Sequence, residues 1–113
     1  MNPGEIYLAQ FPFGDIPGIK LRPVLLLTGT VGSLPEVLAA YISSVIPTQL
    51  LPSDILLDPN EPEFRETHLK VMSTLRLHKL ATVHTSSIVR YLGIMDLPAR
   101  ELVSTKLRDL LGL

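Results

Sequence analysis

Short apolar stretches recur along the 113-residue chain, and segments rich in proline, glycine or polar residues separate them. Apolar residues at alternate positions predict a strand with one buried face, and a short continuous apolar run predicts a strand buried on both faces. These patterns predict strands at residues 5–11, 24–28, 37–43, 54–57, 69–76, 80–84 and 88–95. Loops are predicted at 12–18, 29–35, 47–52 and 58–62.

The C-terminal segment follows a helical period instead. Apolar side chains recur there with the i, i+3, i+4 spacing of one helix face. They are Ala99, Leu102, Val103, Leu107, Leu110 and Leu111. Asp96 and Pro98 suit the first turn of a helix and Gly112 suits its end, so the pattern predicts a helix that begins near Pro98.

Short strands followed by one helix predict an α+β fold that is mainly β, a small barrel of short antiparallel strands with a C-terminal α-helix. Ten prolines favour short elements over a helical bundle. The length and the 46% hydrophobic content predict a single domain over residues 1–113 with its own core. The apolar helix face must be buried over an open barrel end or in a dimer contact.

Composition removes several classes of chemistry. The chain has no cysteine, which excludes disulfides, thiolate metal sites and a cysteine nucleophile. The spacing of the histidines gives no helical metal-binding pair, and no glycine-rich phosphate loop or nucleophile elbow is present. We therefore expect no metal and no cofactor. No targeting segment is apparent, and the longest apolar stretch, 24–27, cannot cross a bilayer, so we expect a soluble cytoplasmic chain without a membrane partner.

The net charge of −1 conceals an asymmetry along the chain. Residues 1–60 carry five acidic and two basic side chains, whereas residues 65–90 carry five basic and one acidic, together with all three histidines. A local basic segment in a neutral protein favours a polyanionic partner. The alternative is an ordinary solvated strand face.

Two polar groups stand where loops meet predicted strands. Arg22 precedes Pro23, which holds its backbone extended, so a rigid guanidinium could clamp a phosphate. The alternative is a surface ion pair with Asp15 or Asp54. The hydroxyls of Ser43 and Ser44 end the third predicted strand, where they could donate to a phosphate or simply cap the turn.

Ordered segments over nearly the whole chain resemble the PemK/MazF family of toxins. The segments are GEIYLAQFPF at 4–13, KLRPVLLL at 20–27, AYIS at 40–43, residues 69–83, and the closing stretches 86–93 and 98–113. The resemblance implies an SH3-like barrel that forms a homodimer. It implies the toxin of a toxin–antitoxin module, inhibited by a cognate antitoxin, that cleaves single-stranded RNA without metal.

The resemblance also implies roles for individual residues. Arg22 matches the catalytic arginine of the family, and Ser43 stands where the family has a catalytic threonine or serine. The expected RNA-binding residues are Lys20, Ser44, Lys70, Arg76, His78 and Lys79. His78 or His84 is an alternative proton-transfer group, because histidine titrates near neutrality.

One departure leaves two other functions open. The loop 14–20 lacks the Gly-Ser-Glu run of many family members. A non-catalytic binding module, such as a gyrase-poison-like toxin of the same fold, is therefore the first alternative. A plain RNA-binding barrel is the second.

Overall fold

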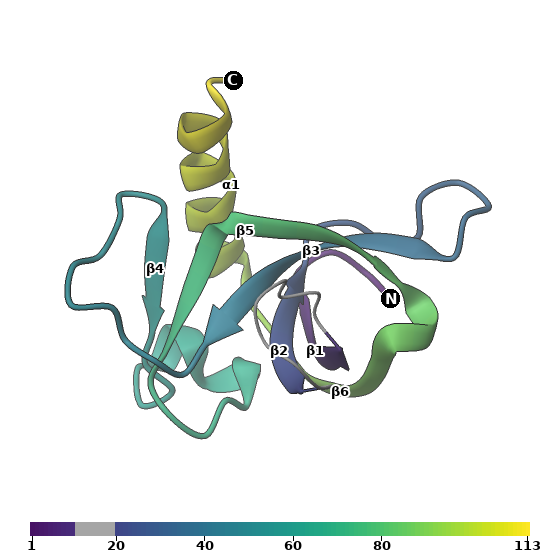
Figure 1. Ribbon diagram of the computed structural model, residues 1–113. Helices are drawn as coiled ribbons and strands as arrows, with labels where there is room; N and C mark the ends of the chain where they lie inside the picture. Colours follow the sequence, from purple (N-terminus) through teal and green to yellow (C-terminus); the bar gives the residue numbers. More distant parts are fainter. Residues whose placement is uncertain (11–19) are drawn as a thin grey trace.

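The computed structural model describes residues 1–10 and 20–113, and strands dominate these residues (Figure 1). The predicted loop at 12–18 lies outside the described residues. The strands are β1 (Glu5–Gln10), β2 (Leu21–Leu26), β3 (Glu36–Ser43), β4 (Asp54–Leu57), β5 (Ser73–His84) and β6 (Ile88–Ile94). Two short 3₁₀ helices, η1 (Pro62–Thr67) and η2 (Thr85–Ser87), precede β5 and β6, and α1 (Leu97–Leu111) ends the chain.

The strands form one antiparallel sheet in the order β4-β5-β3-β2-β1-β6. The predicted fold class, mainly β with a C-terminal helix, is confirmed. Most predicted strands agree with the observed ones to within a few residues, and β4 agrees at both ends. Arg22 lies inside β2 rather than just before it, because pairing with β1 extends the strand back to Leu21.

The predicted strands at 69–76 and 80–84 are wrong in extent. Residues 69–72 are outside the sheet, and residues 73–84 form the single long strand β5. The reason is that no strand of this sheet pairs with residues 69–72. Strand β4 pairs with β5 only from Ser73 onward, and β3 pairs with β5 only from Thr74 onward. An irregularity between Ala40 and Tyr41 lets the eight residues of β3 follow β5 to its end.

The curved sheet has an apolar cluster on each face. One face, here called the helix face, carries Leu25, Ile42 and Leu75, which pack with Ala99 and Val103 of α1. The opposite face, here called the arginine face, carries Val24 and Tyr41 in a second cluster. Because residues directly opposite in an antiparallel pair point to the same side, the register assigns the paired strand residues to a face.

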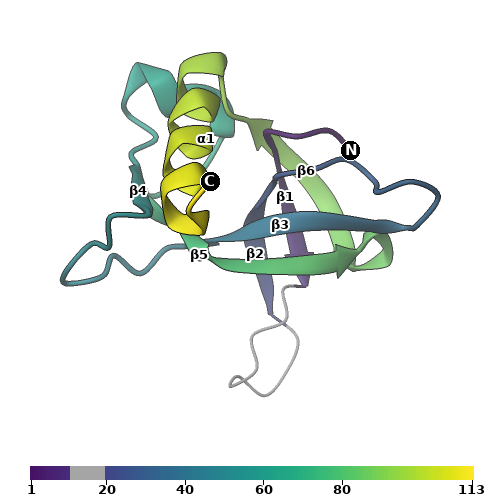
Figure 2. The same ribbon diagram turned by 90° about the horizontal axis from the view of Figure 1, so that it is seen from above.

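Helix α1 is capped as the sequence predicts. The Asp96 carboxylate accepts a hydrogen bond from the Ala99 amide at 3.0 Å, and Gly112 ends the helix in the left-handed conformation at φ 71°. Of the predicted apolar face, only Ala99 and Val103 are fully buried, whereas Leu102, Leu110 and Leu111 stay exposed. Figure 2 shows α1 lying beside β4 and the start of β5, so one side of the helix has no covering element.

No helix in the described part of the chain is long and apolar enough to cross a bilayer.

Candidate active site

Three polar side chains form a cross-strand row on the arginine face. The pairing of β2 with β3 ends at Val24 and Tyr41, and Arg22 and Ser43 each lie two residues beyond that pair on the same face of the sheet. Ser43 pairs with Thr74, and side chains at directly opposed positions are about 5 Å apart at Cβ. The structure therefore places both residues that the sequence predicts as catalytic on one face at the same end of the sheet, with Thr74 beside Ser43.

The two hydroxyls of this row differ in their partners. Ser43 is buried, and its Oγ accepts a hydrogen bond from the Val45 amide at 3.1 Å, so it does cap the turn after β3. That bond uses a lone pair and leaves the O–H proton able to donate. Thr74 is fully buried, and its Oγ1 has no hydrogen-bond partner among the described residues. A buried polar atom without a partner is rare in folded proteins.

The guanidinium of Arg22 makes no ion pair with any residue that the structure describes. Its one hydrogen bond, to the Leu21 carbonyl, is long at 3.5 Å. The alternative partner Asp54 instead receives a hydrogen bond from Nε of Arg76 at 2.9 Å, in an ion pair whose carboxylate is fully buried. Asp15, the other alternative, lies outside the described residues. Arg22 thus keeps donors for a ligand, whereas Arg76 is largely neutralised.

Further cations lie one row along the same face. Tyr41 pairs with Arg76, and Nζ of Lys79 stands 5.7 Å from the Tyr41 ring centroid, within reach of a cation–π contact. Partial burial lowers the pKa of His78 below its ordinary value, and the positive charges of Arg76 and Lys79 lower it further, against the opposing effect of Asp54. These effects together favour the neutral form of His78.

A pocket of about 300 Å³ opens on the helix face at the same end of β2. Leu8, Pro23 and Ile42 line its floor, and Ser44, Lys70 and Arg90 add polar and cationic groups. No carboxylate is present among the described residues that line it. Arg22 also borders the pocket. A cavity of this size is at the small end of the range for drug-sized ligands.

His68 holds the segment that covers this pocket. Its Nδ1 donates a hydrogen bond to the Leu92 carbonyl at 2.9 Å, and its own backbone is left-handed at φ 55°. Gly93 makes this arrangement possible, because a Cβ at that position would collide with the carbonyl oxygens of Glu66 and Thr67. The segment 68–71 is therefore fixed in place by the packing of η1 on β6.

The predicted site residues divide between the two faces. Arg22, Ser43, Arg76 and Lys79 belong to the arginine face, whereas Ser44 and Lys70 line the pocket on the helix face. His78 lies close enough to Arg76 and Lys79 to feel their charges, in the stretch of β5 between the two paired segments. Lys20 is exposed directly before β2 and joins neither group.

His84 is excluded from this site. It pairs with Glu36, seven residues along β3 from Ser43, which is about 23 Å at ~3.3 Å per residue. Its Nδ1 accepts a hydrogen bond from the Ser86 amide. His84 therefore caps η2 and is too far from Arg22 to transfer a proton there.

Sequence reasoning missed three residues of the site: Thr74, His68 and Arg90. The alternation over 69–76 already placed Thr74 on the same side as Arg76, but only the register shows that Ser43 is its neighbour. Arg90 counted toward the basic segment, and only its pairing with Leu8 brings it to the pocket.

The fold and the site together define a class: a small β-rich protein that presents, among its described residues, an arginine without an ion pair on the same face as two hydroxyls and further cations. A family model for PemK-like, MazF-like toxins of type II toxin–antitoxin systems matches residues 2–111. The chain belongs to this family.

Solved structures share the fold at low sequence identity. The Mycobacterium tuberculosis toxin MazF-mt6 matches with a TM-score of 0.74 and 22% identity, over 96% of this chain and 97% of that one. A mycobacterial endoribonuclease in complex with its cognate antitoxin gives 0.72 and 16%, over 100% and 96%. MazF from Deinococcus radiodurans gives 0.70 and 19%, over 100% and 97%. Curated protein sequences give no significant match.

Proposed function

We propose that this toxin-family protein is a metal-independent endoribonuclease that cleaves single-stranded mRNA in the cytoplasm. The observation that carries the proposal is the row Arg22–Ser43–Thr74, which combines an unpaired guanidinium, a hydroxyl able to donate, and a buried hydroxyl without a partner. Family membership and the endoribonuclease among the structural neighbours support it.

The reaction needs little from the protein, because RNA carries its own nucleophile. The 2′-OH attacks the adjacent phosphorus, the P–O5′ bond breaks, and a 2′,3′-cyclic phosphate and a 5′-OH form. Negative charge grows on the non-bridging oxygens in the transition state. Arg22 supplies two directed N–H donors and a permanent positive charge there. The hydroxyl of Ser43 adds a hydrogen bond to the same phosphate.

Proton transfer falls to His78 in this scheme. Its lowered pKa favours the neutral imidazole, whose ring nitrogen can accept the 2′-OH proton. Arg22 is a poor proton donor because its pKa is far above neutrality. Lys70, Arg90 and Lys79 hold the flanking phosphates, with Ser44 beside them, and the pocket on the helix face takes a neighbouring nucleotide.

A second copy of the chain and an antitoxin are the proposed protein partners. The segment after Ser43 exposes apolar side chains: Val45 at 73%, Ile46 at 40%, Leu50 at 41% and Leu51 at 42%. A contiguous exposed apolar surface marks an interaction site. The neighbour bound to its cognate antitoxin supports the antitoxin, and family membership supports the homodimer. Light scattering tests the homodimer, and a strict monomer at micromolar concentration contradicts it.

The decisive experiment is cleavage of single-stranded RNA in excess EDTA. The purified wild-type protein should give products with 2′,3′-cyclic phosphate ends. Arg22→Ala should lower the rate about 10²–10³-fold, the cost of one transition-state donor, and leave the circular dichroism spectrum unchanged. Arg108→Ala is the matched control, since this exposed arginine lies on α1.

Two results would overturn the proposal. One is wild-type cleavage that EDTA abolishes. The other is an Arg22→Ala protein that cleaves as fast as wild type. Inhibition of DNA gyrase without any RNA product would establish the gyrase-poison-like alternative instead. Ser43→Ala and Ser44→Ala refine the picture: only Ser43→Ala should lower the cleavage rate at saturating RNA, because Ser44 points to the other face.

A further inference from the structure

One wall of the pocket on the helix face is a segment that lies outside the sheet. Residues 68–71 line this pocket, and they connect η1 to β5 without pairing with any described strand. Lys70 is exposed on this segment and forms no ion pair with any residue that the structure describes. Because no sheet holds this backbone, its other contacts decide where the charge of Lys70 stands.

His68 begins this segment in an unusual backbone conformation. It is the one residue other than glycine with a positive φ in 1–10 and 20–113, at φ 55° and ψ 23°. Glycine suits the left-handed region best, and strain at another residue type is typical of functional sites. A glycine at this position would lose a long-range contact, because Nδ1 of His68 donates to the Leu92 carbonyl at 2.9 Å.

Core contacts hold the residues on both sides of His68. Thr67 is fully buried, and its Oγ1 accepts a hydrogen bond from the amide of Leu69, which is also buried, at 3.3 Å. The carbonyl of Thr67 lies so close to Gly93 that a Cβ there would collide with it. The segment is therefore anchored as far as Leu69, and Lys70 is the first residue beyond the anchor.

The acceptor of the His68 bond lies in an irregularity of β6. The pairs that Tyr91 and Gly93 make with β1 leave Leu92 between them without an opposite residue. Such a bulge takes its extra residue out of the regular ladder, and bulges are frequent next to active sites. Leu92 and Arg90 both line the pocket. The bond to His68 therefore joins the wall that carries Lys70 to the strand that carries Arg90.

We propose that His68 is a positioning residue for RNA binding, which fixes Lys70 so that Lys70 and Arg90 meet the phosphates of one strand together. This inference rests on the proposed endoribonuclease function and adds a residue that acts without contacting the RNA. Groups already in place lose less freedom on binding than groups that must first be ordered. Because His68 acts through Lys70, it should change the affinity for RNA and not the bond-breaking step.

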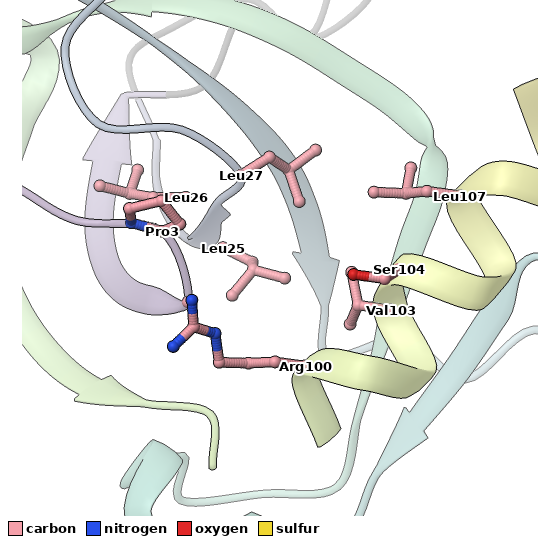
Figure 3. A pocket seen from close by; sticks show the side chains of 9 residues that line it. Pro3, Leu25, Leu26, Leu27, Arg100, Val103, Ser104 and Leu107 are labelled. Carbon is pink, nitrogen blue, oxygen red and sulfur yellow. The ribbon is translucent and has the colours of Figure 1, made fainter. Parts of the chain in front are cut away.

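The smaller pocket between β2 and α1, of about 120 Å³, provides a contrast (Figure 3). Figure 3 shows Arg100 extending from α1 toward the segment that carries Pro3, and a Cβ on Gly4 would stand 2.7 Å from its Nε. Arg100 is the one cation in the described lining of that pocket. No second cation is there to be held in register with it, so Arg100→Ala should leave RNA binding unchanged.

The test measures binding of labelled single-stranded RNA by fluorescence anisotropy in proteins that also carry Arg22→Ala. His68→Gly removes the imidazole and relieves the backbone, and it should weaken binding about two- to tenfold, the net effect of one hydrogen bond. His68→Asn should bind nearly as the parent does, because the asparagine amide places an N–H donor where Nδ1 stands and tolerates the left-handed region. The matched control is His84→Gly, which removes an exposed histidine far from the site and should leave binding unchanged.

A double-mutant cycle shows whether His68 acts through Lys70. In a Lys70→Ala background, His68→Gly should weaken RNA binding no further, because the charge that His68 positions is already gone. In proteins that keep Arg22, His68→Gly should raise KM for RNA cleavage and leave kcat unchanged, the pattern of a lost binding contact.

Three results overturn the positioning role while wild-type cleavage stands. The first is unchanged RNA binding by His68→Gly. The second is equal weakening by His68→Asn and His68→Gly, which would show that the imidazole contacts the RNA itself. The third is full additivity with Lys70→Ala. A wild-type protein that neither binds nor cleaves RNA would instead overturn the proposed function, and the positioning role with it.

Discussion

Each end of β2 has beside it a pocket lined by an arginine that forms no ion pair with the residues the structure describes, yet the surroundings of the two arginines differ. At the first end, Arg22 has two hydroxyls in its row and several cations close by. At the other end, Arg100 stands alone above an aliphatic lining. The number of cations around an arginine thus separates a surface suited to a chain of phosphates from one that is not.

The two ends also differ in how their charges are held. Near Arg22, the fully buried carboxylate of Asp54 holds Arg76 and accepts a second hydrogen bond from the Leu51 amide at 2.8 Å. This network joins β4 to β5 behind the active-site row. Near Arg100, packing against Gly4 positions the side chain without an ion pair. The active-site end should therefore be the one whose integrity depends on charge.

The largest expected effect follows from removing that buried carboxylate. Asp54→Ala leaves the Arg76 guanidinium without its partner and the Leu51 amide without an acceptor, so we expect a loss of about 2–4 kcal/mol in the free energy of unfolding. Urea unfolding measures it. The control is Asp58→Ala, which removes a carboxylate from an exposed turn and should cost less than about 0.5 kcal/mol.

The same variant sharpens the comparison of the two ends. In the protein that remains folded, Asp54→Ala should impair RNA cleavage, whereas Arg100→Ala should leave the cleavage rate at the wild-type level. Equal losses of cleavage in the two variants would show that the two ends of β2 are not independent. An unfolding free energy within 0.5 kcal/mol of wild type, in the range of ordinary surface substitutions, would contradict the structural role given to the ion pair.

Sequence reasoning reached the first end of β2 because its signals are local. Pro23 fixes the backbone next to Arg22, and the strand that carries Ser43 ends as predicted. Capping residues likewise predicted α1. Thr74 and Arg90 escaped because their importance depends on register, which no local pattern encodes. The extent of β5 escaped for the same reason: residues 69–72 alternate like a strand but have no strand to pair with.

The second end of β2 could not be predicted at all. In the sequence, Arg100 is one of several charged residues in the predicted helix. Only the structure shows that its side chain packs against Gly4, which lies near the other end of the sequence. Long-range contacts of this kind depend on how α1 packs on the sheet. The apolar pattern of α1 predicted a helix but not the part of the sheet against which the helix packs. Most of that apolar face is not buried.

An intermediate effect concerns the salt dependence of RNA binding. Each phosphate contact on a single strand contributes about 0.7 to the slope of log K against log salt concentration. Lys70→Ala should lower the magnitude of that slope by about 0.7, because Lys70 lines the pocket beside Arg22 and has no carboxylate partner among the described residues. Arg100→Ala is the control and should leave the slope unchanged.

The measurement is RNA binding at several salt concentrations. Each variant also carries Arg22→Ala, so that the RNA is not cleaved during the titration. A slope that drops with Arg100→Ala would break the distinction between the two ends.

The smallest effect is a change in the pKa of His78, which reports the charge balance at the active-site end. Burial lowers this pKa first, Arg76 and Lys79 lower it further, and Asp54 opposes them. Lys79→Met should therefore raise the pKa of His78, and Asp54→Asn should lower it. Arg100→Met, at the other end of β2, should leave the pKa of His78 unchanged.

The lowered pKa of His78 also affects the pH dependence of stability. The unfolded chain binds a proton at His78 more readily than the folded one. This residue therefore lowers the stability as pH falls below its ordinary pKa of about 6.5 and has no such effect well above that pH. His78→Gln should remove that part of the acid destabilisation. NMR titration of the histidine ring gives the pKa directly, and a wild-type value above 6.5, or one that Lys79→Met does not move, would contradict the placement of His78 beside these cations.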